Sequence, residues 1–151
     1  DVSLPDWTIR IQYGLGESEN HHKTPLFAER MSPVVSPELV SGRTSWLDLP
    51  RLALSGPRLG WHEWSRQTGD PITPIPKIRF DSLSAALSAA VSGAGVLLAS
   101  LPLCAAHLEQ GKLERVSSHV LEPPETYWMM VSKDGFTKTQ WNNVVEAFAE
   151  K

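Results

Sequence analysis

Ser82 stands where its hydroxyl and the backbone next to it could bind a small anion. The pattern around it predicts a strand ending at Phe80, a cap at Asp81 or Ser82, an Ala-rich helix stopped by Gly93, and an apolar strand opened by Gly95. The first N–H groups of a helix lack intrahelical partners and carry partial positive charge, so such an end can hold a carboxylate. An ordinary β-α-β unit without a ligand has the same pattern, with Ser82 as a simple N-cap. Both interpretations stay open on the local pattern.

A metal site is the second chemistry that the residue types permit. Glu17, Glu19, His21 and His22 stand close together in the chain, and imidazole and carboxylate groups suit zinc. Adjacent histidines in a polar loop rarely converge on one ion, however, and no further ligand stands at a suitable spacing. We therefore expect a solvated loop and no metal.

Enzymatic chemistry is not indicated. The chain has no G-x-S-x-G nucleophile motif, and no base for Ser82 is evident. The segment Gly14-Leu15-Gly16 lacks the third glycine and the helix of a dinucleotide-binding fingerprint, so no cofactor is predicted. The single cysteine, Cys104, stands in an apolar segment and is expected to be a buried, unreactive thiol.

The composition is that of a globular protein and limits the partners. A length of 151 residues, with 41% hydrophobic and 21% charged residues, suits one domain or two small lobes. The net charge of −3 disfavours binding of this chain to DNA or to anionic lipid. No apolar run is long enough for a membrane span and the first residues show no signal-peptide pattern, so a cytoplasmic location is expected.

Strand and helix patterns alternate along most of the chain. This order predicts the α/β class with a mixed, mainly parallel sheet. Residues 14–23 are expected to form a polar loop, and Pro33 in the second strand indicates an edge strand or an irregular passage. Trp61 and Trp64 stand at i and i+3 and are expected to pack in the core. The expected strands are 7–13, 26–35, 51–54, 77–80, 96–100, 113–116 and 126–132, and the expected helices begin near Ser36, Pro57, Ser82, Pro102 and Thr137.

Six motifs follow one another along the chain. They are Asp6-Trp7-Thr8-Ile9-Arg10, Met31-Ser32-Pro33-Val34-Val35-Ser36-Pro37-Glu38-Leu39, Trp61-His62-Glu63-Trp64, the segment from Phe80 to Val96, Leu108-Glu109-Gln110-Gly111-Lys112-Leu113, and Thr126-Tyr127-Trp128. Each alone is weak, but their order and spacing together are specific. In this order the chain resembles the effector-binding domains of LysR-type transcriptional regulators over nearly its whole length. Within that family it is similar to the subgroup that includes regulators of glycine cleavage and of chromosomal β-lactamase.

The resemblance implies a two-lobed α/β fold of the type II periplasmic-binding-protein kind, with an effector between the lobes. Residues 17–95 would form lobe two, and residues 1–16 and 96–151 would form what is present of lobe one, with hinges near Gly14 and Ser100. Strands 7–13 and 96–100 are then expected in adjoining parts of one sheet. The winged helix-turn-helix and the first half of lobe one that family members carry upstream are absent from these residues. Promoter DNA is therefore expected to be bound only through that N-terminal domain, in a parent protein that is a homo-oligomer and has no membrane partner.

The resemblance also implies four effector-binding residues. Ser82 matches a family serine at a helix N-terminus, where a carboxylate can bind. Tyr127 matches an aromatic residue that faces the cleft, although a strand residue packed in the core would fit the same pattern. Asp6 and Thr8 lie at the end of the first strand beside the hinge. The acidic Asp6 is similar to an acidic residue that the subgroup uses at this place to bind its effector. The expected effector is a small anionic or zwitterionic molecule.

The expected function is that of an effector-binding regulatory domain of a LysR-type transcription factor. A solute-binding protein of a transport system has a similar fold and is the alternative, and a small α/β enzyme is a third hypothesis. The spacing of the tryptophan pair and of Phe80-Asp81-Ser82 favours the regulator. A signal peptide in the parent gene would favour the transport protein instead.

Overall fold

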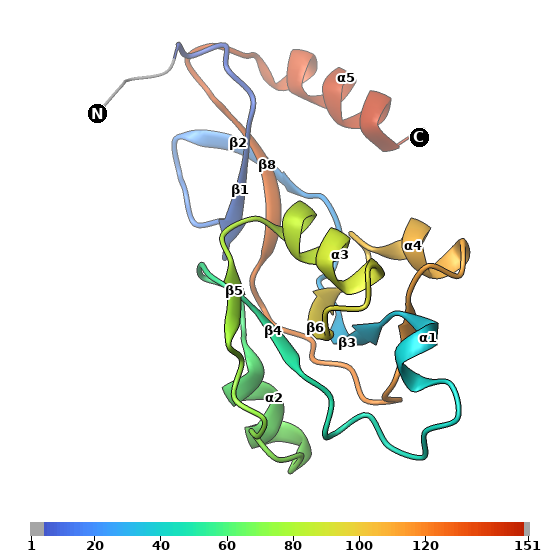
Figure 1. The fold of residues 1–151 in the computed structure, drawn as a ribbon. Coiled ribbons are helices and arrows are strands. Elements are labelled where there is room, and N and C mark those ends of the chain that lie inside the picture. Colours follow the sequence, from blue (N-terminus) through green and yellow to red (C-terminus); the bar gives the residue numbers. More distant parts are fainter. Residues whose placement is uncertain (1–4, 150–151) are drawn as a thin grey trace. The chain divides into compact units, whose positions relative to one another are not determined.

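The computed structural model describes residues 5–149, which belong to two compact units (Figure 1). Unit 1 combines Asp1–Ala28 with Pro124–Lys151, and unit 2 is the continuous segment Glu29–Pro123. None of the helices between residues 5 and 149 combines the length and the apolar character that a membrane crossing requires.

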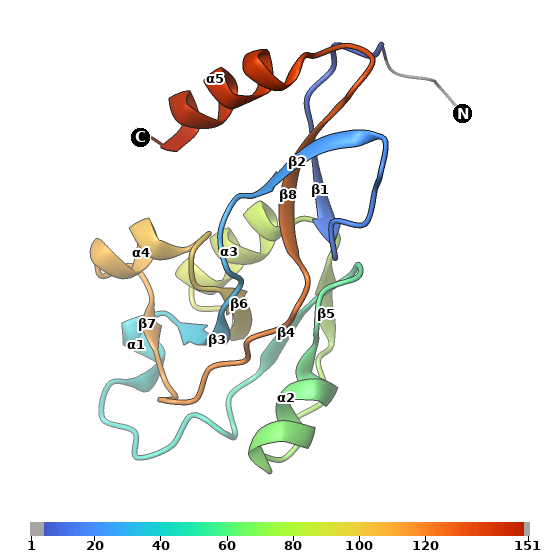
Figure 2. The ribbon, with the colours of Figure 1, turned by 180° about the vertical axis from the view of Figure 1, so that it is seen from behind.

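Unit 1 is built on a three-stranded antiparallel sheet in the order β1-β8-β2. Its strands are β1 (Arg10–Gly14), β2 (His21–Pro25) and β8 (Thr126–Ser132). Figure 2 shows β1 and β2 on the two sides of β8, which is the strand predicted at residues 126–132. The register places Tyr127 opposite Tyr13 and Met129 opposite Ile11.

Helix α5 (Lys138–Ala149) packs on this sheet and begins at the predicted cap. The Thr137 hydroxyl accepts a hydrogen bond from the Gln140 N–H at 3.1 Å, and the Gln140 side-chain oxygen accepts one from the Thr137 N–H at 2.8 Å. This reciprocal pair is a capping box, which satisfies two donors at the start of the helix. Trp141 on the first turns is buried against Met129 and Val131 of β8, so the apolar side of the helix is fixed to the sheet.

Unit 2 is built on a five-stranded sheet in the order β5-β4-β6-β3-β7. Its strands are β3 (Met31–Val35), β4 (Arg51–Leu54), β5 (Ile78–Phe80), β6 (Val96–Ser100) and β7 (Glu114–Arg115). Strand β4 pairs in parallel with β5 and β6, whereas β3 pairs antiparallel with β6 and β7. The mixed sheet is confirmed, but the prediction of a mainly parallel one is wrong, because four of the six strand pairings in the two units are antiparallel.

Helices cover both faces of the unit 2 sheet. On one face lies α3 (Leu83–Val91), whose Ala86, Leu87 and Ala90 are buried with alternate strand residues that include Leu97. On the other face lies α2 (Trp61–Thr68), whose two tryptophans are buried with the intervening strand residues that include Leu98. Successive side chains of a strand point to opposite faces, so Leu97 and Leu98 belong to different clusters. Two short helices complete the unit, α1 (Pro37–Val40) and α4 (Ala105–Glu109).

The segment from Phe80 to Ser100 forms as predicted. Strand β5 ends at Phe80, Ser82 caps α3, and β6 begins at Val96. Gly93, with φ +90°, ends the helix in the left-handed conformation that glycine adopts without strain. Each of these signals is local in the sequence, which explains why the pattern could be recognised from it.

Two local predictions about strands are wrong. His21, His22 and Lys23 belong to β2 rather than to a loop, because β8 supplies their backbone hydrogen bonds from more than a hundred residues away. Pro33 lies in β3, which is flanked by β6 and β7 and is not an edge strand. The Pro33 carbonyl accepts a hydrogen bond from the Val116 N–H, so the Pro33 nitrogen faces the same side of the strand as β7. Pro33 lies beyond the two residues of β3 that pair with β7, so the N–H that proline lacks removes no hydrogen bond from that pairing.

The boundaries of the two units differ from those expected for the lobes. Residues 17–28 lie in unit 1 because β2 pairs with β8, and residues 96–123 lie in unit 2 because β6 pairs with β3 and β4. The expectation that strands 7–13 and 96–100 share a sheet is wrong, since β1 and β6 belong to different sheets. The chain passes between the units after Ala28 and after Pro123, rather than near Gly14 and Ser100.

Candidate functional site

Ser82 is the N-cap of α3 in unit 2. Its Oγ accepts a hydrogen bond from the Ala85 N–H at 3.3 Å, which is long beside the usual value of about 2.9 Å. Ser82 is exposed, and the N–H groups of Leu83 and Ser84, at the first two helical positions, have no intrahelical acceptor. This helix end can therefore offer a hydroxyl and backbone donors to a ligand.

The charges beside this helix end are mixed. Asp81 immediately precedes the cap and is exposed, while the helix N-terminus carries partial positive charge. A ligand carboxylate would be attracted by the helix end and repelled by Asp81, whereas a ligand ammonium group would be attracted by Asp81. The arrangement suits a small molecule that carries both charges.

Tyr127 lies in unit 1, in the middle of an aromatic cluster. Its ring contacts Tyr13 edge-on, with centroids 5.1 Å apart, and Phe27 at 5.7 Å. The Tyr127 carbonyl accepts from the Leu26 N–H at 2.8 Å, and the neighbouring Thr126 hydroxyl donates to the Phe27 carbonyl at 2.6 Å. The sequence analysis did not predict that Tyr13 and Phe27 contact Tyr127, because Tyr127 is about a hundred residues away from both. The one local signal was the position of Tyr13 at the end of a predicted strand, directly before a glycine.

Asp6 and Thr8 lie at the opposite end of β1 from Tyr127. They form a turn in which the Thr8 N–H donates to the Pro5 carbonyl at 3.0 Å. At about 3.3 Å per residue, the distance along the strand from Thr8 to Tyr13, the partner of Tyr127, is about 16 Å. The structure therefore does not bring Asp6 and Thr8 together with Tyr127 around one small ligand within unit 1. Ser82 belongs to the other unit.

Glu29, at the start of unit 2, is a buried acid that sequence reasoning missed. It is 3% exposed. Its Oε1 accepts from the Ser100 hydroxyl at 2.7 Å and from the Arg30 N–H at 3.0 Å, while its Oε2 has no partner among the described residues. Burial raises the pKa of Glu29, an effect that these hydrogen bonds and the charge of Arg58 reduce but do not cancel. No sequence signal marked it, since a single glutamate before a strand is common on surfaces.

Replacing Glu29 by glutamine is expected to stabilise the chain at neutral pH and to change little near pH 4. As the pH rises above the ordinary carboxyl pKa of 4.5, Glu29 ionises in the unfolded chain before it ionises in the folded chain. The free energy of unfolding of the wild type therefore falls until the pH passes the raised pKa of the folded state, and it stays lower at higher pH. Glutamine retains an oxygen for Ser100 and Arg30 without the charge. Urea denaturation at about pH 4 and about pH 7.5 measures the difference. The exposed Glu122→Gln change should have no comparable effect, and a less stable Glu29→Gln chain at pH 7.5 would contradict the prediction.

Trp61 and Trp64 are core residues, as expected. Trp64 is fully buried and its indole N–H donates to Asp70 at 2.9 Å. Trp61 donates to the Leu52 carbonyl at 2.8 Å and lies 5.0 Å from the guanidinium of buried Arg51. A second ring, that of Trp46, lies 5.4 Å from the same guanidinium. Such cation–π contacts compensate part of the cost of burying Arg51.

The candidate metal ligands point to different partners. His21 Nδ1 lies 2.6 Å from the Ser18 hydroxyl, while His22 Nε2 lies 3.0 Å from the Phe136 carbonyl. Neighbouring residues of a strand point to opposite faces, which separates the two imidazoles. Between residues 5 and 149, no group of three or more His, Cys, Asp or Glu side chains is placed to hold a metal ion. Cys104 is buried at the start of α4, and burial raises the pKa of its thiol to about 11.

The family model of the LysR substrate binding domain matches residues 6–151 of this sequence. The chain belongs to this family. Its relatives include the transcriptional activator AmpR of Rhodobacter capsulatus, 32% identical over 107 residues that make up 70% of this chain, and the regulator PerR of Escherichia coli, 32% identical over 111 residues that make up 72% of it. This LysR substrate-binding domain spans only 37% of the length of each of these relatives.

Solved effector-binding and regulatory domains have the same fold. The AmpR effector-binding domain of Citrobacter freundii matches with a TM-score of 0.77 at 23% identity, covering 95% of this chain and 75% of that domain. The regulatory domain of HypT from Salmonella typhimurium matches with a TM-score of 0.73 at 13% identity, covering 95% and 73%. The expected α/β fold of the type II periplasmic-binding-protein kind is thereby confirmed for this LysR domain.

Proposed function

We propose that this chain is the effector-sensing part of a LysR-type transcriptional regulator and that it binds a small zwitterionic or anionic molecule at the N-terminus of α3. The observation that carries the binding proposal is the weak, exposed cap at Ser82, with Asp81 beside it. The ligand carboxylate accepts hydrogen bonds from the helix end and from the Ser82 hydroxyl. An amino-acid-like ammonium group, where the ligand has one, pairs with Asp81.

Tyr127 remains a proposed effector-binding residue of unit 1, as the resemblance to the family implies. Tyr13 and Phe27 hold its ring in place. Asp6 and Thr8 lie too far along β1 to contact the same small ligand as Tyr127 within unit 1. We therefore give them a smaller role in effector binding than Ser82. In the proposed regulator, the lobes of the family correspond to units 1 and 2 with the boundaries found here.

The proposed regulator acts on promoter DNA in the cytoplasm, as a homo-oligomer, through a DNA-binding domain outside these residues. The net charge of −3 disfavours binding of the present chain to the phosphate backbone. AmpR and PerR are transcriptional regulators, which supports this proposal and gives the solute-binding alternative no support. The same relatives are consistent with a chain that is not an enzyme.

A thermal-denaturation screen with amino acids, short peptides, small carboxylates and their neutral amides tests the binding proposal. A ligand that binds only the folded chain stabilises it by about 2.7 kcal/mol at a concentration of a hundred times its dissociation constant, so the Tm should rise with dose. We expect the rise for charged members of the panel and not for the matching amides. Equal effects of acids and amides, or no effect of any member, would contradict binding at a helix N-terminus.

A further inference from the structure

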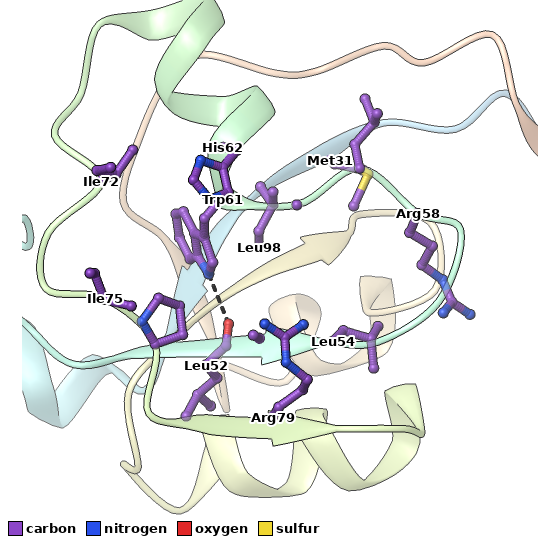
Figure 3. A pocket seen from close by; sticks show the side chains of 14 residues that line it. Met31, Leu52, Leu54, Arg58, Trp61, His62, Ile72, Ile75, Arg79 and Leu98 are labelled. Carbon is purple, nitrogen blue, oxygen red and sulfur yellow. Dashed lines mark hydrogen bonds between the residues drawn. The ribbon is translucent and has the colours of Figure 1, made fainter.

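A pocket of about 330 Å³ opens on the face of the unit 2 sheet that α2 covers (Figure 3). Its floor includes Ala53 of β4 and Leu98 of β6, with Met31 at the start of β3. Trp61 stands beside this floor, held by the hydrogen bond from its indole N–H to the Leu52 carbonyl. The floor of the pocket therefore rests on regular structure.

The rim of the pocket adds further apolar surface. The loop between α2 and β5 contributes Ile72, which is 41% exposed, and Ile75, which is 68% exposed. Together with the floor, these side chains form one apolar surface that would leave water if a hydrocarbon body were bound. The pocket thus has the apolar lining that small-molecule sites share.

The charged groups of the pocket all have one sign. Its fourteen lining residues include Arg58, Arg79 and the weak base His62, and no carboxylate. Arg79 pairs in register with Ala53, which places its side chain on the α2 face of the sheet, and in Figure 3 its guanidinium extends over the floor. Arg79 makes no hydrogen bond or ion pair with any residue that the structure describes. Arg58 adds positive charge, part of which the nearby Glu29 compensates.

A helix N-terminus contributes positive charge from a second direction. Gly60 is the N-cap of the eight-residue helix α2 and has no side chain that could accept from the first N–H groups. Gly60, Trp61 and His62 line the pocket, so these uncapped donors lie at its wall. An anion in the pocket would meet both this helix end and the guanidinium of Arg79.

We propose that this pocket binds a small organic carboxylate with an apolar body, such as an aromatic ring or a short hydrocarbon chain. Arg79 pairs with the carboxylate, and the apolar body lies on Ala53, Leu98 and Trp61. Arginine suits this role because its planar guanidinium can donate two parallel hydrogen bonds to one carboxylate. The volume of about 330 Å³ lies near the lower end of the range of small-molecule sites, about 300–1,000 Å³, which limits the ligand to a small body.

This second site goes beyond the proposed effector function. It lies on the α2 face of the sheet, whereas Ser82 caps α3 on the opposite face. The chemistry also differs, because Asp81 stands beside Ser82 and favours a ligand with an ammonium group, while the pocket has no carboxylate that could pair with one. A Ser82 variant that loses effector binding would leave the pocket and its ligand unaffected.

The test is a titration of the ¹⁵N-labelled chain with 4-phenylbutyrate and, separately, with its neutral amide, 4-phenylbutyramide, followed by NMR. The Trp61 indole N–H lies at the pocket and is the reporter, assigned with a Trp61→Phe variant. We expect a saturable shift of this signal and of the backbone signals of residues 52–62 and 72–79, with an affinity about tenfold higher for the acid than for the amide. No saturable shift of the Trp61 signal, or equal affinity for acid and amide, would overturn the proposal.

Two arginine variants complete the experiment. The Arg79→Gln change should weaken binding of 4-phenylbutyrate about tenfold and leave binding of the amide unchanged, since only the charge-assisted hydrogen bonds are lost. The matched control is Arg115→Gln on β7, at the other edge of the same sheet, which should alter the affinity less than about twofold. Both arginines are exposed, so neither change removes a core contact. Equal effects of the two variants would show a general electrostatic attraction and contradict the site.

Discussion

Replacing Ser82 by aspartate is expected to weaken binding of a carboxylate effector while leaving α3 intact. Aspartate caps helices about as well as serine, so the accepted bond from the Ala85 N–H is retained. It also places a negative charge where the ligand carboxylate would lie, and two like charges about 4 Å apart repel by about 1 to 4 kcal/mol near a protein surface. The affinity should therefore fall at least about fivefold, as measured by calorimetry with the strongest ligand of the thermal-denaturation screen.

Three further variants separate the cap from the binding role. The Ser82→Asn change retains a cap without charge and should leave stability unchanged. The Ser82→Ala change removes both roles and should cost about 1 kcal/mol of stability and about 1 kcal/mol of binding. The control is Ser88→Ala, an exposed serine within the same helix, which should affect neither. If the aspartate variant binds the effector as tightly as the wild type, Ser82 is a cap and nothing more.

Replacing Gly95 by alanine is expected to cause the largest loss of stability of any single methyl addition in unit 2. A Cβ at this position would lie 2.5 Å from the carbonyl oxygen of Pro50 and 3.1 Å from its carbon. The same oxygen accepts a hydrogen bond from the Val96 N–H at 2.8 Å, where β6 and β4 begin to pair. Because backbone rather than a flexible side chain blocks the methyl group, the two strands must separate, and we expect a loss of about 3 kcal/mol or more.

The neighbouring Gly93 is a matched control two residues away. Its φ is +90°, but a Cβ there would meet no atom within 4 Å. The Gly93→Ala change should therefore cost only the backbone strain of about 1 to 2 kcal/mol. Urea denaturation followed by tryptophan fluorescence measures both variants, with Trp61 and Trp64 as reporters within unit 2. Equal losses at the two glycines would show that steric contact with Pro50 is not the cause.

The parts of the fold that were predicted from the sequence are those with local signals. The cap at Ser82, the stop at Gly93 and the capping residue Thr137 are each fixed by residues within one helical turn, and each forms as predicted. The bounds of β8 were also correct, since a run of aromatic and branched residues favours a strand without reference to its partners. Local chemistry determines where these elements begin and end.

The pairing of strands could not be predicted in the same way. The polar residues His21 to Lys23 carry no alternating pattern, and only the distant strand β8 makes them a strand. The position of β6 between β4 and β3 likewise depends on contacts between distant segments, which led to the wrong assignment of residues 96–100. For the candidate site, Ser82 follows from local pattern, whereas the cluster of Tyr13, Phe27 and Tyr127 and the pocket at Arg79 exist only after distant segments meet.

The central position of β8 has a consequence for the order in which the chain folds during its synthesis. Unit 2 is one continuous segment that ends at Pro123, so all its strands have been made before β8 leaves the ribosome. Unit 1 cannot form its sheet at that stage, because β1 and β2 pair only with β8 and not with each other. Domains generally fold as units while the chain emerges. Strands β1 and β2 are therefore translated before the strands of unit 2 but are expected to pair with β8 only after that whole unit has been made.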